Sequence, residues 1–328
     1  MKKSRLPSLA SLLFEDIGDD IQAAAKDGPA AVRTLANSAK DKEALKNALK
    51  GSYDKKPDDD TVSVAEGAIV AVNSLLPTQK EIDLVQSVGW PMCDLNTLVK
   101  MIKTKMSTAP GSITVSGNLI IDGHHRWSST WSIAGADGKI SVDDIALPGS
   151  TQAEKLAAAQ LAIAAYKPAT AQQPAAADPI EINILGASPE KVAEMLIKAG
   201  QEGRKDPNAP APVMNPKFLE DCAKDSTVAG WAGFEVGADV ETVKQALAKK
   251  VGSNLATLPK NDEAPARADM PQLDAETIGG KQAKADIKAG LKSGEFNVSP
   301  PFKPTESISN SDKVIMERWQ RLAGIIKD

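Results

Sequence analysis

Residues 113–134 read I-T-V-S-G-N-L-I-I-D-G-H-H-R-W-S-S-T-W-S-I-A and decide the fold of the region around them. Two apolar runs within residues 113–122 are separated by Ser116-Gly117-Asn118, which predicts a β-hairpin closed by a tight turn. Residues 126–134 have the pattern of a helix that begins directly after the D-G-H-H turn. The stretch therefore predicts a hairpin followed at once by a helix.

The flanking sequence extends this unit in both directions. Residues 68–73 resemble a strand, and residues 94–106 have apolar side chains at the spacing of an amphipathic helix that begins at an Asp or Asn cap. Residues 139–148 predict another strand. Between residues 66 and 148 the order is strand, helix, hairpin, helix, strand, which indicates a small domain of the α/β (α+β) class.

The remainder of the chain is predicted to be mainly helical. A length of 328 residues favours two domains or one domain with ordered appendages. We divide the chain into a helical N-terminal arm and linker (1–60), the α/β domain (61–150), and a helix-rich region with Pro/Ala linkers (151–328). The expected helices are 16–50 with a break at Gly28-Pro29, 151–166, 188–200 with a Ser188 cap and a closing Gly200, two near 216–224 and 240–250, and an amphipathic helix at 312–327. One strand is expected at 180–185. Linkers are expected at 51–60, 167–179 and 206–216, and residues 260–306 are polar and contain several prolines.

Composition limits the classes of partner. The net charge is −4, so the chain as a whole has no electrostatic attraction to nucleic acid or anionic membrane. Its two cysteines, Cys93 and Cys222, have no metal-ligand or CxxC spacing, which favours a reducing compartment. No apolar run approaches the roughly 20 residues of a membrane span. We expect a cytoplasmic protein without a membrane partner.

The chain has only two histidines, and they are adjacent at the hairpin–helix junction. Gly123 allows a sharp turn and a close approach to the backbone. His124 and His125 follow at a helix N-terminus, where unpaired N–H groups favour an anion. Arg126 adds a planar donor fork suited to phosphate or carboxylate. These residues together predict an anion site, with phosphate as the leading ligand.

Other interpretations of the same residues are weaker. Adjacent histidines diverge and the chain has no third one, so His124 and His125 are not expected to chelate a metal. No nucleophile elbow accompanies them, which disfavours a Ser-His-Asp triad. A purely structural turn with hydrogen-bonded histidines remains an alternative. Trp127 and Trp131 share a helix face and are expected to pack in the core rather than stack on nucleobases.

The junction, together with L-L-P-T-Q-K-E-I at 75–82, resembles the ParB/sulfiredoxin superfamily over about residues 66–148. In that family a segment like P-x-Q opens the domain, and a G-x-H-R type loop at a helix start binds nucleotide phosphates. This sequence has no cysteine in the loop, so sulfiredoxin activity is not expected. No helix-turn-helix follows the domain, unlike in the chromosome-partitioning members. The D-G-H-H-R form is similar to nucleotide-dependent kinases and to ParB-like nucleases, many of them phage-encoded.

The resemblance assigns roles to particular residues. Glu81 and His125 become the candidate catalytic residues, with Glu81 as general base. No metal-ligand set is expected, although Asp122 is placed to hold a Mg²⁺ ion that arrives with the phosphates. The candidate phosphate-binding residues are Thr78, Gln79, Asp122, Gly123, His124, His125 and Arg126.

Three functions follow from these expectations. The first is an enzyme that uses a nucleotide (ATP, ADP or CTP) or DNA as a phosphotransferase or phosphodiesterase (DNase). The second is a nucleotide- or DNA-binding module without turnover. The third is a phage structural or interaction protein with a non-catalytic domain, as a homo-oligomer or part of a virion. In the phage case its location would be the host cytoplasm or the virion.

Overall fold

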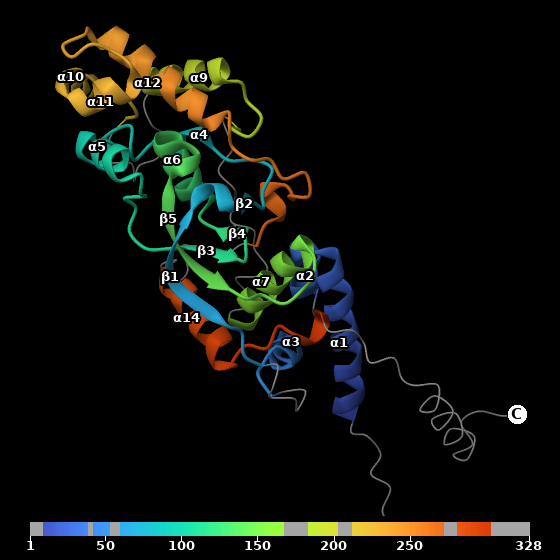
Figure 1. The fold of residues 1–328 in the computed structure, drawn as a ribbon. Coiled ribbons are helices and arrows are strands. Elements are labelled where there is room, and N and C mark those ends of the chain that lie inside the picture. Colours follow the sequence, from blue (N-terminus) through green and yellow to red (C-terminus); the bar gives the residue numbers. More distant parts are fainter. Residues whose placement is uncertain are drawn as a thin grey trace, which may run out of the picture.

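The computed structural model describes residues 9–38, 42–52, 60–166, 183–202, 212–271 and 281–302. These residues form a five-stranded mixed sheet with helices on both sides (Figure 1). The expected α+β class is therefore confirmed. The expected helix at 312–327 and the linker 167–179 lie outside the described residues.

The sheet has the strand order β1-β5-β3-β4-β2. The outer strand β1 (Val64–Ala71) pairs antiparallel with β5 (Lys139–Ile145), which runs parallel to β3 (Ile113–Ser116). Strand β3 and β4 (Leu119–Asp122) form the expected antiparallel hairpin, and the short β2 (Leu76–Pro77) is parallel to β4. The hairpin places the end of β4, and the histidines after it, near the sheet edge formed by β2.

One core lies between the sheet and the helices α4 to α6 and α9 to α12. Alternate strand residues such as Ile120 and Val142 point into it, and Trp127 is its largest fully buried side chain. Asp94 caps one of these helices by accepting a hydrogen bond from Thr97 N at 3.0 Å. The helices are α4 (Leu84–Val88), α5 (Leu95–Thr104), α6 (His124–Ala134), α9 (Pro189–Glu202), α10 (Pro216–Lys224), α11 (Ser226–Ala232) and α12 (Val240–Leu255).

A second core lies on the other side of the sheet (Figure 1). Its centre is α7, in which Ala157, Ala158 and Ala164 are fully buried, so neighbouring helices approach its backbone closely. The N-terminal helices thus pack on this chain's own sheet and α7. The helices on this side are α1 (Leu9–Asp27), α2 (Pro29–Ser38), α3 (Lys42–Ala48), α7 (Gln152–Tyr166) and α14 (Lys281–Ser293).

Several boundaries differ from the expected ones. Helix α6 begins at His124, two residues early, so both histidines lie in its first turn. Helix α9 continues past Gly200 to Glu202. The expected strand 180–185 is reduced, in its described part, to one isolated bridge between Asn183 and Asp83. Helices α4, α11 and α14 were not expected, and the short strand β2 lies in a segment that was expected to be a turn.

Short 3₁₀ turns complete the described chain. They are η2 (Val72–Ser74), η3 (Gly135–Asp137), η4 (Arg267–Asp269) and η5 (Pro300–Phe302). Cys93 and Cys222 form no disulfide bond in the described part of the chain. Of the helices in the described ranges, none combines the length and apolar character required to cross a membrane.

Candidate functional site

The β4–α6 junction turns on Gly123, which has a φ of +104°. A side chain there would meet Ile113, whose Cγ2 lies 2.4 Å from the position of an added Cβ. The Gly123 carbonyl then accepts hydrogen bonds from Arg126 N and Trp127 N, both at 3.0 Å. Helix α6 therefore begins within one residue of the strand. The N–H groups at its N-terminal end have no acceptor within the helix and point out of that end. We refer to residues 122–126 as the junction.

His124 connects the junction to the turn after β2. Its Nε2 accepts a hydrogen bond from Thr78 N at 3.0 Å and lies 3.4 Å from Thr78 Oγ1, which also donates to the Ile120 carbonyl. Burial is the main cause that lowers the pKa of His124 to about 3, and His125 adds to it. His124 is therefore a neutral imidazole that accepts a hydrogen bond, and the structure brings Thr78 to it as expected.

His125 differs from its neighbour because it has an unpaired atom. Its Nε2 is buried and has no hydrogen-bond partner among the described residues. Burial, followed by the charge of Arg267, lowers the pKa of His125 to about 4. A buried polar atom without a partner is uncommon in folded proteins and is a mark of a site that awaits a ligand or a water molecule.

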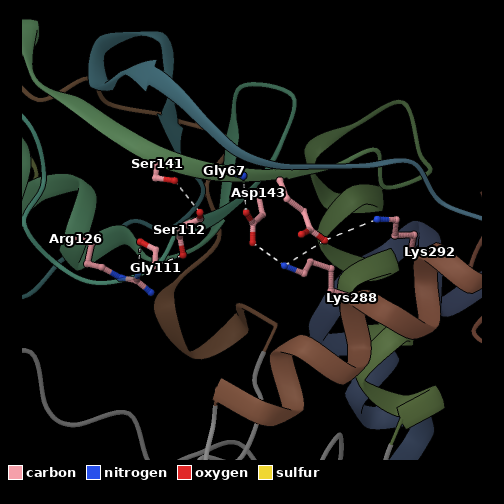
Figure 2. A network of polar contacts seen from close by, with 9 residues as sticks. Gly67, Gly111, Ser112, Arg126, Ser141, Asp143, Lys288 and Lys292 are labelled. Carbon is pink, nitrogen blue, oxygen red and sulfur yellow. Dashed lines mark hydrogen bonds and ion pairs between the residues drawn. The ribbon is translucent and has the colours of Figure 1, made fainter.

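The guanidinium of Arg126 is held on one side only. Its Nη1 donates to the carbonyls of Pro110 and Gly111 at 3.2 Å and of Ser112 at 3.1 Å, as Figure 2 shows in part. Its Nε and Nη2 have no partner in the part of the chain that the structure describes, and no carboxylate there pairs with it. Arg126 thus fixes the loop before β3 and keeps donor atoms available.

Asp122 is paired with a residue from the second side of the sheet. Lys284 Nζ of α14 lies 2.6 Å from Asp122 Oδ2, and both side chains are about half exposed. Burial acts to raise the pKa of Asp122, but Lys284, then Arg126 and His124, together bring it below its usual value. The carboxylate is thus already neutralised by a cation. The described residues contain no group of three or more His, Cys, Asp or Glu side chains placed to hold a metal ion by themselves, and a Mg²⁺ ion that arrives with the phosphates stays a prediction.

The other expected site residues lie in the turn that follows β2. Thr78 and Gln79 are buried, and Thr78 makes the contact with His124 described above. Glu81 Oε2 accepts a hydrogen bond from Arg267 N at 2.7 Å. The structure thus gives Glu81 a structural contact, and its role as a general base remains a prediction.

Arg267 was not expected at the site. It lies in η4, about 140 positions beyond the histidines, yet its charge contributes to the low pKa of both. Its Nη1 is buried and has no hydrogen-bond partner among the described residues. The surrounding sequence is polar and proline-dotted, and no spacing or motif in it marks this arginine.

The tryptophans of α6 are core residues, as expected. Trp127 and Trp131 are 0% and 3% exposed, and their ring centroids lie 5.6 Å apart in an edge-to-face arrangement. Trp127 Nε1 donates to the Val72 carbonyl at 2.9 Å, and Trp131 Nε1 donates to Thr257 Oγ1 at 3.0 Å. They hold α6 on the sheet and are not available to stack on a base.

Two open clefts lie away from the junction. One, of about 720 Å³, is lined by residues of α3, α7 and α14, including Lys46, Tyr166 and Asp286. The other, of about 440 Å³, lies between α9 and α12. Neither cleft is lined by a junction residue. The unpaired atoms of His125 and Arg267 are buried and line neither cleft.

The two histidines predict a particular dependence of stability on pH. Their pKa values are about 3 and 4 in the folded chain, against 6.5 in the unfolded chain. Between these pH values the unfolded state binds more protons than the folded state. We therefore expect the contribution of the two histidines to the free energy of unfolding to be complete above pH 6.5 and to decrease as the pH falls below it. Urea unfolding between pH 7 and pH 5 measures this slope, above the range in which most carboxyl groups titrate.

The variant His125→Gln should remove the part of the slope of unfolding free energy against pH that comes from one titrating histidine. Because the chain has only two histidines, the remainder belongs to His124. A slope that is equally steep in the variant and the parent would contradict a buried, neutral His125.

The junction therefore carries three kinds of group that can bind an anion: the first N–H groups of α6, the Nε and Nη2 of Arg126, and the unpaired Nε2 of His125. A neutral imidazole at the same point can accept a proton. No protein-family model, curated protein or solved structure was found to match the chain. The resemblance to the ParB/sulfiredoxin superfamily accordingly stays a prediction that depends on the residues of the junction and of the turn after β2.

Proposed function

We propose that the junction binds a phosphate group of a nucleotide or of DNA and that the protein acts there as a phosphotransferase or phosphodiesterase. The observation that carries this proposal is that one helix turn holds both Arg126, with donor atoms and no carboxylate partner in the described chain, and the buried, unpaired Nε2 of His125. Both lie in the first turn of α6. Each of these groups gains a hydrogen-bond partner when an oxyanion binds.

Phosphate fits this arrangement better than a carboxylate. Its oxygens can accept from several donors at once, as they do at helix N-termini, and the planar guanidinium of Arg126 can donate two parallel bonds to it. Asp122 does not repel the ligand, because Lys284 balances its charge at 2.6 Å.

In the proposed reaction, the oxygen of water or of an acceptor hydroxyl attacks the phosphorus atom, and the bond from phosphorus to the leaving oxygen breaks. The proton of the attacking oxygen passes to His125 or to Glu81. His125 is a weak base in the empty site, with a pKa of about 4. A bound phosphate raises that pKa because its negative charge stabilises the imidazolium ion.

Ligand binding tests the proposal through Arg126. We expect ATP, ADP, CTP or GTP to raise the melting temperature of the parent protein, because a ligand that binds the folded state stabilises it. Arg126→Ala should weaken the affinity by about tenfold or more through the loss of a charge-assisted hydrogen bond. Calorimetric titration with each nucleotide, with and without Mg²⁺, measures the effect.

Two further variants make this test specific. Arg126→Lys keeps a donor for the carbonyls of residues 110–112 but loses the planar fork, so it separates ligand binding from folding. Lys103→Ala removes an exposed cation from α5 and should change nothing. The proposal fails if no nucleotide stabilises the parent, or if Arg126→Ala binds as tightly as Lys103→Ala.

Binding without turnover is the second candidate function. Two observations favour it. Glu81, the candidate base, accepts a hydrogen bond from Arg267 N, and the Nε2 of His125 is buried. Incubation with supercoiled plasmid and, separately, with radiolabelled ATP distinguishes the candidates. Nicking or phosphate transfer that His125→Ala abolishes would establish an enzyme, whereas tight binding without either product would establish a binding module.

A further inference from the structure

A segment after α12 crosses the turn that follows β2. We call residues 258–271 the strap. Lys80 N donates to the Pro265 carbonyl at 2.9 Å, Arg267 N donates to Glu81 Oε2 at 2.7 Å, and Thr78 Oγ1 lies 3.8 Å from Met270 Sδ. The strap is therefore in contact with the same turn that binds His124 through Thr78 N.

The helices of the second core hold both ends of the strap. Near its start, Asn261 Nδ2 donates to the Pro77 carbonyl at 2.8 Å and to Gln152 Oε1 of α7. Near its end, the buried Arg33 of α2 donates to the carbonyls of Ala268 at 2.7 Å and Met270 at 2.6 Å. Anchors on both sides fix the place of the residue between them, Arg267.

The side chain of Arg267 has no compensating anion among the residues that the structure describes. Glu81 accepts from its backbone N–H, and no described carboxylate forms an ion pair with its guanidinium. Its Nη1 is buried and without a hydrogen-bond partner, as is Nε2 of His125. Arg267 as a residue is partly buried, but a buried donor atom without an acceptor is unfavourable unless something supplies that acceptor.

We propose that Arg267 is a second anion-binding residue of the site, brought to it by the strap, and that a phosphate oxygen is shared between Arg267 Nη1 and His125 Nε2. This inference depends on the proposed function, and it adds a residue from outside the region that resembles the ParB/sulfiredoxin superfamily. Both atoms are buried in the free chain. The site thus consists of two parts, the junction and the strap.

Three variants test this inference in the full-length chain. Arg267→Ala and Arg267→Gln remove the guanidinium but keep the backbone N–H that bonds to Glu81. Lys260→Ala removes an exposed cation from the same strap and is the matched control. We expect either change at Arg267 to weaken binding of ATP and of inorganic pyrophosphate by about tenfold or more, and Lys260→Ala to leave both affinities unchanged.

The histidine ring signals in a proton NMR titration provide a readout that does not depend on a ligand. The chain has two histidines, so only two sets of imidazole ring signals titrate and need to be assigned. The charged groups that act on His125 are Arg267 from the strap and Asp122 from β4. Loss of the arginine should raise the pKa of His125 in the free protein, whereas Lys260→Ala should leave it in place.

The outcomes separate the two proposals. If neither ATP nor pyrophosphate binds the parent, the proposed function fails and the inference fails with it. If both bind and Arg126→Ala weakens them, but the Arg267 variants bind like Lys260→Ala, the inference alone is overturned and Arg267 packs against His125 without touching the ligand. If one Arg267 variant fails to fold, the other decides by the same criterion.

Discussion

Gly123→Ala should lower the free energy of unfolding by about 2–5 kcal/mol. A φ of +104° costs an L-residue about 1–2 kcal/mol in backbone strain. The new Cβ would also lie 2.4 Å from Ile113 Cγ2 and 2.7 Å from Ile113 Cβ, so β3 must move away from the junction. Such overpacking typically costs about 1–3 kcal/mol more. Urea denaturation followed by circular dichroism measures the sum.

Gly67→Ala is the matched control for this prediction. Gly67 also has a positive φ, of +71°, but an added Cβ would meet no atom within 4 Å. It should therefore show the backbone strain without the steric clash. Equal losses for the two variants would mean that contact with Ile113 does not constrain the junction.

Trp127→Ala should lower the free energy of unfolding by about 3–5 kcal/mol, which is enough to unfold many domains. The ring is fully buried, packs against Trp131 at 5.6 Å between centroids, and donates to the Val72 carbonyl at 2.9 Å. Its removal leaves a large cavity and takes away one of the two hydrogen bonds that the Val72 carbonyl accepts, the other coming from Leu75 N. Thermal and urea unfolding, with the far-ultraviolet spectrum as a check on folding, measure the loss.

Two other tryptophan variants provide the comparison. Trp127→Phe keeps most of the apolar volume and should lose about 0.5–1.5 kcal/mol, because the Val72 carbonyl loses the hydrogen bond from Trp127 Nε1 and keeps the one from Leu75 N. Trp90 is 50% exposed, and Trp90→Ala should change stability by about 0.5 kcal/mol or less. A loss at Trp90 as large as that at Trp127 would contradict the placement of the core on α6.

Local signals were enough to predict most of the sheet unit. The hairpin turn at Ser116-Gly117-Asn118 and the cap at Asp94 involve residues within a few positions of one another, and the structure confirms both. The start of α6 was placed two residues late because its cap is made by backbone geometry at Gly123 and not by a capping side chain.

Helix α14 shows why other elements were missed. Its sequence is polar, and its placement depends on distant partners: Lys288 lies 2.9 Å from Asp143 Oδ2 and 3.6 Å from Glu66 Oε1, and Lys292 also approaches Glu66 (Figure 2). These contacts join residues more than 140 positions apart. No local pattern of hydrophobicity can indicate them.

The candidate site divides in the same way. Residues 122–126 and Thr78 were identified from a turn motif and its resemblance to a known family, and the structure brings Thr78 into hydrogen-bonding contact with His124. Lys284 beside Asp122 and Arg267 near both histidines were not identified. Lys284 belongs to α14 and Arg267 to the strap, and both elements lie near the junction because they pack on the helices of the second core.

The sequence by itself thus determined the hairpin, the helix that follows it, and the concentration of both histidines at their junction, because periodicity, turn residues and caps act over a few positions. The tertiary structure alone decided which charges surround those histidines. Burial keeps them neutral, Lys284 neutralises Asp122, and the strap places Arg267 beside them. The physical reason is that desolvation and Coulomb interactions depend on distance in space, which residues far apart in the chain acquire only when the two cores pack on the sheet.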